Sequence, residues 1–139
     1  MGLGNPGPEF LDTRHNAGFR LAEHLSTRWR FGAFRRGERA RVAEGLRDGH
    51  TVRLLQPQTY MNRSGAALAP FRALSDFEPS RDLLILVDDV ALALGRFRLA
   101  QFRHIFGNDE RTVCRANQVN ELVLRNRVPS LTVENVVQS

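Results

Sequence analysis

The chain has 139 residues, of which 42% are hydrophobic, a length and composition that suit one domain with a modest core. No apolar run approaches the roughly 18 residues of a membrane span. Residues 1–10 also lack the basic start and apolar segment of a secretion signal. Cys114 is the one cysteine, which excludes an internal disulfide and a cysteine-based metal cluster. A cytoplasmic location is therefore the default expectation.

The net charge is +5, and all 20 basic side chains are arginine. The excess lies in residues 1–107, which hold 16 arginines and 11 acids, whereas residues 108–139 hold four of each. Guanidinium groups pair well with phosphates, so this excess suits a polyanionic partner such as RNA. A GC-rich genome would produce the same arginine bias, and a surplus of this size also occurs in proteins that bind no nucleic acid.

The N-terminal region predicts a turn followed by a helix. Residues 1–8, MGLGNPGP, form turns readily because glycine permits positive φ and proline fixes φ. Apolar residues then recur at helical spacing and predict a helix that ends near Arg28. Thr13 or Asn16 could cap its start.

The middle of the chain predicts alternating strands and helices. The expected elements, in order, are a loop with a short strand over 30–49, a strand over 51–55, a loop over 57–65 that leads into a helix over about 65–75, and strands over 82–87 and 96–99. The run DLLILV at 82–87 is the clearest strand, because a continuous apolar run is typical of an interior strand covered on both faces. This order indicates an α/β fold, namely a single domain with a twisted mixed sheet flanked by helices, expected to be incomplete.

Beyond Gly107 the pattern weakens, because no glycine follows and the apolar residues keep no sustained period. We therefore expect an α/β domain over residues 1–107 and a divergent, poorly ordered segment over 108–139. A segment that buries little apolar area cannot offset the entropic cost of ordering its backbone.

The segment GLGNPG at residues 2–7 fits the dinucleotide-binding pattern G-x-G-x-x-G. That pattern requires a preceding strand, and here the printed chain begins at the motif. Pro6 and Pro8 also suit a phosphate-binding turn poorly. The sequence therefore disfavours a nucleotide site.

The same segment belongs to an ordered series of motifs. The series is GLGNPG at 2–7, TRHNAG at 13–18, PQTYMNRSG at 57–65, VDD at 87–89 and GR at 95–96. In order and spacing it resembles the bacterial-type peptidyl-tRNA hydrolases, over about residues 2–107. The resemblance implies an enzyme that cleaves the ester between a peptide and the 3′ end of tRNA, without metal or cofactor.

The resemblance also implies the site residues. His15 would be the catalytic base and Asp88 its partner, Asn5 and Asn62 would be active-site amides, and Phe10 and Tyr60 would lie along the pocket for the tRNA end.

The chemistry of such an ester hydrolysis supports these roles. Histidine ionises near neutral pH and is a natural base for activating water. A carboxylate beside it fixes the tautomer and stabilises the imidazolium, as in the serine hydrolase triads. Asp88 follows a predicted buried strand, where ligands bind in open α/β sheets. The amide of Asn62 suits a carbonyl oxygen that becomes negative, and Asn5 could hold the peptide group of the substrate.

Each of these residues also has a structural explanation when it is taken alone. His15 could be a surface residue at a helix start, and Asp88 a turn or cap residue. Asn62 could simply form a turn, and Tyr60 could be a core residue. The combination favours the functional interpretation. His24, His50 and His104 are expected to be structural or exposed, and no metal-binding spacing is present.

The sequence also departs from the family pattern. Met1 stands where a hydrophobic strand would end, which predicts the loss of a central strand and of the rigid support for Asn5. Phe10 replaces a tyrosine, and Ala91 and Ala93 replace an acid and a proline. After Leu99 the substrate loop is missing, which suggests a truncated or out-of-frame end; no role is assigned to Asn108, its one remnant.

Three functional hypotheses follow. The first is a monomeric cytoplasmic peptidyl-tRNA hydrolase with peptidyl-tRNA as its partner and no membrane association. The second is a non-catalytic RNA-binding relative of the same fold, or an inactive remnant. The third, a dinucleotide-binding fragment, requires a strand before Gly2 that the printed chain lacks. Retention of His15 and Asp88 favours the first.

Overall fold

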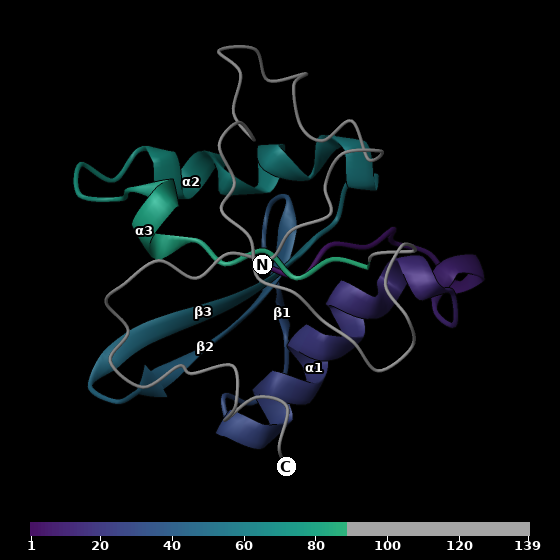
Figure 1. Ribbon diagram of the computed structural model, residues 1–139, viewed down its shortest axis with the longest axis horizontal. Helices are drawn as coiled ribbons and strands as arrows, with labels where there is room; N and C mark the ends of the chain where they lie inside the picture. Colours follow the sequence, from purple (N-terminus) through teal and green to yellow (C-terminus); the bar gives the residue numbers. More distant parts are fainter. Residues whose placement is uncertain (89–139) are drawn as a thin grey trace.

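The computed structural model describes residues 1–88, and its helix α1 (Ala17–Trp29) forms where apolar residues recur at helical spacing, as predicted (Figure 1). Short helices make up the rest of the helical structure, namely η1 (Pro8–Phe10), η2 (Arg14–Asn16), η3 (Met61–Leu68), α2 (Ala69–Arg72) and α3 (Pro79–Asp82). The helix predicted over about 65–75 is therefore η3 followed by α2, and it begins earlier. The predicted strand at 96–99 and the segment 108–139 lie outside the described residues.

The strands β1 (Arg35–Arg36), β2 (Ala40–Arg47) and β3 (His50–Pro57) form an antiparallel sheet in the order β1-β2-β3. The turn between β2 and β3 is Asp48-Gly49, and both residues have positive φ, 52° and 80°. Such Asp-Gly turns match the twist of a hairpin and fix its register, here with Arg47 opposite His50. The strand predicted at 51–55 is confirmed within β3.

The prediction of a loop with a short strand over residues 30–49 was wrong, because β2 alone has eight residues. Its buried positions, Ala40 and Ala43, are small, and its exposed positions are Arg41, Glu44 and Leu46. The strand is stabilised by pairing with β3 along its whole length, a tertiary effect that the local apolar pattern does not reveal.

Residues 1–3 do not form the expected turn. The Gly2 N–H donates to Leu55 O of β3 at 2.9 Å, and the Leu3 N–H donates to Leu86 O at 2.8 Å. Gly2 and Leu86 form a parallel bridge, so the backbone of residues 1–3 lies between β3 and the segment 84–86. The predicted α/β fold with a sheet and flanking helices is confirmed, and this bridge adds a parallel pairing beside the antiparallel sheet. Residues 1–3 form no assigned strand, as the predicted loss of a central strand implies, yet their backbone still occupies that position.

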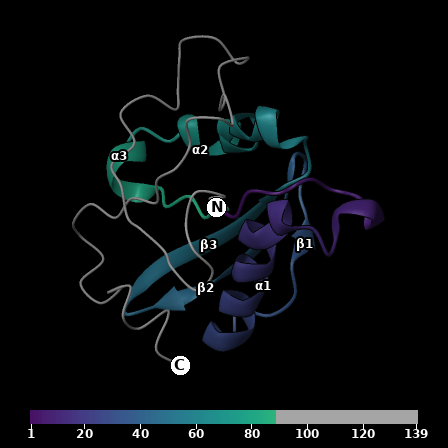
Figure 2. The same ribbon diagram turned by 45° about the vertical axis from the view of Figure 1, so that its right-hand side comes forward.

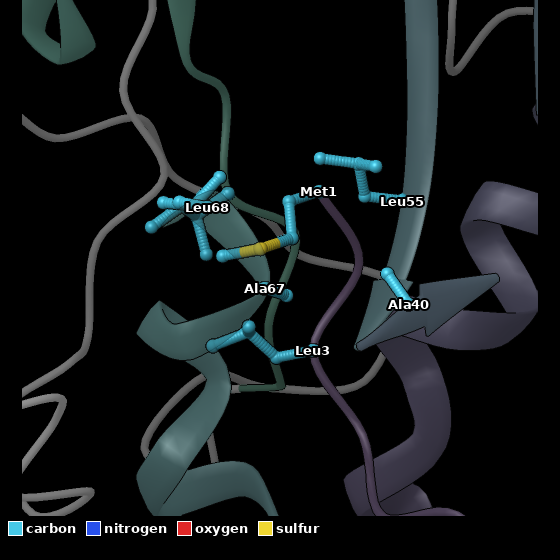
Figure 3. Close-up of a cluster of buried hydrophobic side chains, with 7 residues drawn as sticks. Met1, Leu3, Ala40, Leu55, Ala67 and Leu68 are labelled. Carbon is cyan, nitrogen blue, oxygen red and sulfur yellow. The ribbon is translucent and has the colours of Figure 1, made fainter. Parts of the chain in front are cut away.

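The strand predicted over residues 82–87 is not assigned as a strand. Asp82 ends α3, and within residues 83–87 the one assigned backbone pairing is the parallel bridge at Leu86. Ile85 is buried in the cluster with Met1, Leu3 and Leu68, which Figure 3 shows, and Leu86 is buried in the other cluster, beside Leu25 of α1. Alternate residues therefore face two covered sides, which explains the continuous apolar run.

Helices cover both sides of this sheet. Figures 1 and 2 show α1 on one side of the β2–β3 hairpin and α2 on the other. Leu54 packs with the α1 cluster, and the next residue, Leu55, packs with Ala67 and Leu68 of η3. Within residues 1–88 no helix is long and apolar enough to span a bilayer.

The glycines of GLGNPG permit close packing. A Cβ on Gly2 would lie 2.1 Å from the carbonyl oxygen of Gly18, and one on Gly18 would lie 2.3 Å from the oxygen of Leu86. The start of α1 can therefore approach the backbone of the sheet only without side chains at these positions. Of the three glycines in the motif, Gly7 alone has positive φ, 128°.

Candidate active site

His15 and Asp88 are 73 residues apart in the chain and form a direct contact. His15 lies in the turn η2, and Asp88 lies two residues after the parallel bridge at Leu86. The distance from His15 Nδ1 to Asp88 Oδ2 is 3.0 Å, which confirms the predicted proximity. A neutral ring that donates from Nδ1 keeps its lone pair on Nε2, where it can accept a proton.

The two side chains differ in exposure. The side chain of His15 is 56% exposed, and that of Asp88 is 14% exposed. A ring this exposed can reach a substrate or a water molecule. The more buried carboxylate is the better fixed of the two and can orient the ring.

Asn5 is held by two segments of the chain. Its N–H donates to Asn16 Oδ1 at 2.7 Å, and its carbonyl oxygen accepts from Asn16 Nδ2 at 3.1 Å. Its side-chain Oδ1 accepts from the Met61 N–H at 2.9 Å. Because Oδ1 is engaged, the Nδ2 group is the part of the Asn5 carboxamide left for a ligand. The expectation that Asn5 lacks rigid support was therefore wrong.

Tyr60 and Asn62 lie on either side of Met61, at the start of η3. Both are exposed, Tyr60 by 64%, so the interpretation of Tyr60 as a core residue is wrong. The buried Ser64 fixes this turn by donating from Oγ to Met61 O at 2.9 Å. The Met61–Asn5 hydrogen bond joins this turn to Asn5, and Asn5 is bound by Asn16, the neighbour of His15 in η2.

Phe10 is half-buried at the end of η1. Its carbonyl oxygen accepts hydrogen bonds from the N–H and the hydroxyl of Thr13, at 3.0 and 2.8 Å. No described interaction joins its ring to His15 or Tyr60 within residues 1–88, so its place along the pocket remains a prediction. His24 and His50 are exposed and lie in α1 and β3, as expected.

Two buried amides were missed as members of this region. Asn16 was predicted only as a possible helix cap, yet its side chain binds Asn5. Gln56 at the end of β3 is fully buried, and its Nε2 donates to Phe19 O and to Glu23 Oε1 of α1, at 3.1 and 3.0 Å. The sequence offered one signal for each residue. Asn16 is a polar residue next to His15, and Gln56 is a polar residue just before the motif at 57–65.

Metal chemistry has no candidate site in the part of the chain that the structure covers. Residues 1–88 contain no group of three or more His, Cys, Asp or Glu side chains that could hold an ion. The arrangement offers instead a histidine beside a carboxylate, together with oriented amide donors. This set can activate water and bind a carbonyl group.

Comparison with known proteins gives a consistent result. A family model described as "Peptidyl-tRNA hydrolase" matches residues 1–108. The peptidyl-tRNA hydrolase of Gemmatimonas aurantiaca is 43% identical over 99 residues, covering 71% of this chain and 52% of that protein. That of Chloroflexus aggregans is 45% identical over 103 residues, covering 73% and 54%. The chain thus spans about half the length of these relatives.

Solved structures of the same name are also similar. A crystal structure of a peptidyl-tRNA hydrolase in complex with N-propanol has a TM-score of 0.65 and 39% identity, covering 71% of this chain and 50% of that one. A peptidyl-tRNA hydrolase structure from Acinetobacter baumannii has a TM-score of 0.66 and 31% identity, covering 99% and 73%.

Proposed function

Because this chain belongs to the peptidyl-tRNA hydrolase family, we propose that it hydrolyses the ester between a peptide and the 3′ end of tRNA. The observation that carries the proposal is the 3.0 Å contact between His15 and Asp88. An exposed imidazole whose Nδ1 faces a fixed carboxylate is a water-activating base, and it lies next to the segment that holds Asn5.

The proposed reaction begins when His15 Nε2 takes a proton from a water molecule, whose oxygen attacks the ester carbonyl. Asp88 stabilises the imidazolium that forms. Asn62 donates a hydrogen bond to the carbonyl oxygen as it becomes negative, and Asn5 Nδ2 holds the peptide group of the substrate. The ester bond then breaks, the ribose oxygen receives the proton from His15, and the peptide leaves as a carboxylic acid. Each role is a proposal for this chain.

The exposed arginines of β1 and β2 support binding of a tRNA partner. Arg36 lies directly opposite Arg41 in the sheet register, and Arg35 and Arg39 are exposed beside them. Like charges opposite each other in a sheet repel, so a bound phosphate would stabilise this edge. Charged residues on an edge strand also prevent pairing with other chains, which is the alternative explanation.

The test is release of peptide from peptidyl-tRNA by the purified chain. We expect His15→Ala to abolish hydrolysis, and His24→Ala, which alters an exposed histidine of α1, to leave it unchanged. A chain that binds tRNA without hydrolysing it, with or without His15, would support the non-catalytic RNA-binding alternative instead. A monomeric cytoplasmic enzyme without metal or cofactor is the form we propose; light scattering and a chelator control check its assembly and metal independence.

A further inference from the structure

Asn16 lies where a helix cap is expected but does not act as one. It immediately precedes α1, at the position where an asparagine oxygen ordinarily accepts a hydrogen bond from the first turn of the helix. Here the side chain makes no such bond. The residue is 2% exposed, and its carboxamide binds both backbone polar groups of Asn5. The start of the helix therefore forgoes a stabilising contact.

The two hydrogen bonds fix the orientation of Asn5. Asn16 holds its backbone on both sides, and Met61 occupies its side-chain oxygen. A carboxamide has one acceptor group and one donor group, so the donors at Nδ2 remain for a ligand. Within residues 1–88 the hydrogen bonds of Asn5 are those to Asn16 and Met61, and none of them uses Nδ2.

Asn16 is also adjacent to His15 in the same short turn. His15 is exposed and reaches Asp88, whereas Asn16 is buried and reaches Asn5. One turn thus fixes the proposed base and the proposed amide donor relative to each other. A displacement of either group by about 1 Å can cost an enzyme about 10²-fold in rate.

We propose that Asn16 is a positioning residue for the hydrolysis. It fixes the backbone of Asn5, so that the Asn5 carboxamide, bound through Oδ1 to the Met61 N–H, offers Nδ2 to the substrate. Through Asn5 and Met61 it also joins the His15 turn to the start of η3. The effect of Asn16 on the reaction rests on the proposed function. Its stabilisation of Asn5, and through Asn5 of the hydrogen bond from Met61, does not.

Gly4 provides an independent way to disturb the same contact. A Cβ on Gly4 would lie 2.6 Å from Asn16 Oδ1 and 2.8 Å from the ring of Phe19. Gly4→Ala should therefore displace the Asn16 carboxamide without removing a functional group. Ser26→Ala is the matched control, because Ser26 is a buried polar residue of α1 that binds a backbone oxygen far from the site, Gly32 O at 2.7 Å.

The experiment compares variants of the 139-residue chain that are folded at the assay temperature. We expect Asn16→Ala and Gly4→Ala to lower kcat by about 10- to 100-fold, with a smaller change in KM. Asn16→Asp, which keeps the oxygen that accepts from Asn5, should lose less than Asn16→Ala. Ser26→Ala should keep the kcat of the original chain. Equal kcat in the Asn16 and Ser26 variants would overturn the proposal.

A second readout separates this inference from the proposed function. Loss of Asn16 should release Asn5 Oδ1 and speed hydrogen exchange at the Met61 N–H, as measured by NMR. If the original chain hydrolyses nothing, the proposed function fails and this exchange rate alone decides the inference. Unchanged protection of Met61 in Asn16→Ala would then overturn it.

Discussion

The two ends of α1 use their polar groups differently. At the C-terminal end, the Phe31 N–H donates to Ser26 O at 3.0 Å and the Arg30 N–H donates to Thr27 O at 3.2 Å. Arg30 adopts the left-handed conformation, so this end is a complete Schellman motif. The hydroxyl of Ser26 adds a bond to Gly32 O. Backbone carbonyl groups of the last helical turn therefore accept hydrogen bonds from the residues that directly follow the helix.

At the N-terminal end, the side chain in the capping position serves another segment. Asn16 binds Asn5 instead of the first turn of the helix. Its neighbour His15 is exposed and bound to Asp88. The difference teaches that one end of α1 is built for stability and the other for placing polar groups. Substitutions at the two ends should therefore separate stability from activity.

After the loss of hydrolysis expected for His15→Ala, the largest expected effect is that of Asp88→Asn on turnover. An amide can either accept from Nδ1 or donate to it, so it no longer selects the tautomer that leaves Nε2 as the base, and it carries no charge to stabilise the imidazolium; kcat should fall by about 10²-fold or more. Because the His15 ring is largely exposed, the free energy of unfolding should change by less than about 1 kcal/mol. Peptide release and urea denaturation measure the two quantities. If the loss of stability were large enough to account for the lost activity, it would contradict the view that the N-terminal end of α1 serves activity and the C-terminal end serves stability.

Ser26→Ala should have the opposite profile. It leaves the Gly32 carbonyl without its hydroxyl donor, which should destabilise the fold by about 1–2 kcal/mol. Activity per folded molecule should remain unchanged. Urea denaturation followed by circular dichroism gives the first value, and active-site-normalised peptide release gives the second. A kcat that falls in step with stability would remove the distinction between the two ends.

Substitutions in β1 should have a smaller effect, on tRNA binding. Arg35→Gln and Arg36→Gln should each lower the slope of log affinity against log salt by about 1, because each removes one phosphate partner. Titrations of labelled tRNA at about 50 and 200 mM salt give the slope. The matched control is Arg81→Gln, because Arg81 is paired with Asp82 on α3. If the two β1 variants showed the same slope of log affinity against log salt as the Arg81→Gln control, β1 would be excluded as a phosphate contact.

The smallest expected effect is that of Arg30→Gly at the stable end of α1. Arg30 has a φ of 58°, a conformation that costs residues with a Cβ roughly 1–2 kcal/mol. Glycine removes that strain but gains entropy in the unfolded chain, so we expect a net gain of about 0.5–1 kcal/mol. Thermal unfolding measures the gain. A loss of stability would indicate that the arginine side chain itself stabilises this end.

The sequence predicted those features that depend on local pattern or on ordered motifs. The 3.6-residue period of α1 predicted the helix and its end near Arg28, and the family resemblance that the ordered motifs carry implied the contact between His15 and Asp88. Local pattern failed for β2, which depends on pairing with β3, although Asp48-Gly49 was a usable turn signal.

The role of Asn16 could not be predicted for a different reason. An asparagine before a helix has a strong local explanation as a cap, and the sequence does not show which partner it binds. Its partner, Asn5, is 11 residues away and comes near only when Gly4 leaves room for the carboxamide. The prediction for residues 1–3 failed similarly, because their hydrogen bonds are to β3 and to Leu86.

The state of the His15 ring tests the central claim most directly. Nitrogen chemical shifts of the imidazole, measured by NMR above the pH at which the ring ionises, distinguish the two neutral tautomers. We predict that Nδ1 carries the hydrogen and faces Asp88, leaving the lone pair on Nε2, and that Asp88→Asn abolishes this preference. A ring that carries its hydrogen on Nε2, or one whose shifts are the same with and without Asp88, would contradict the proposal that this pair activates water.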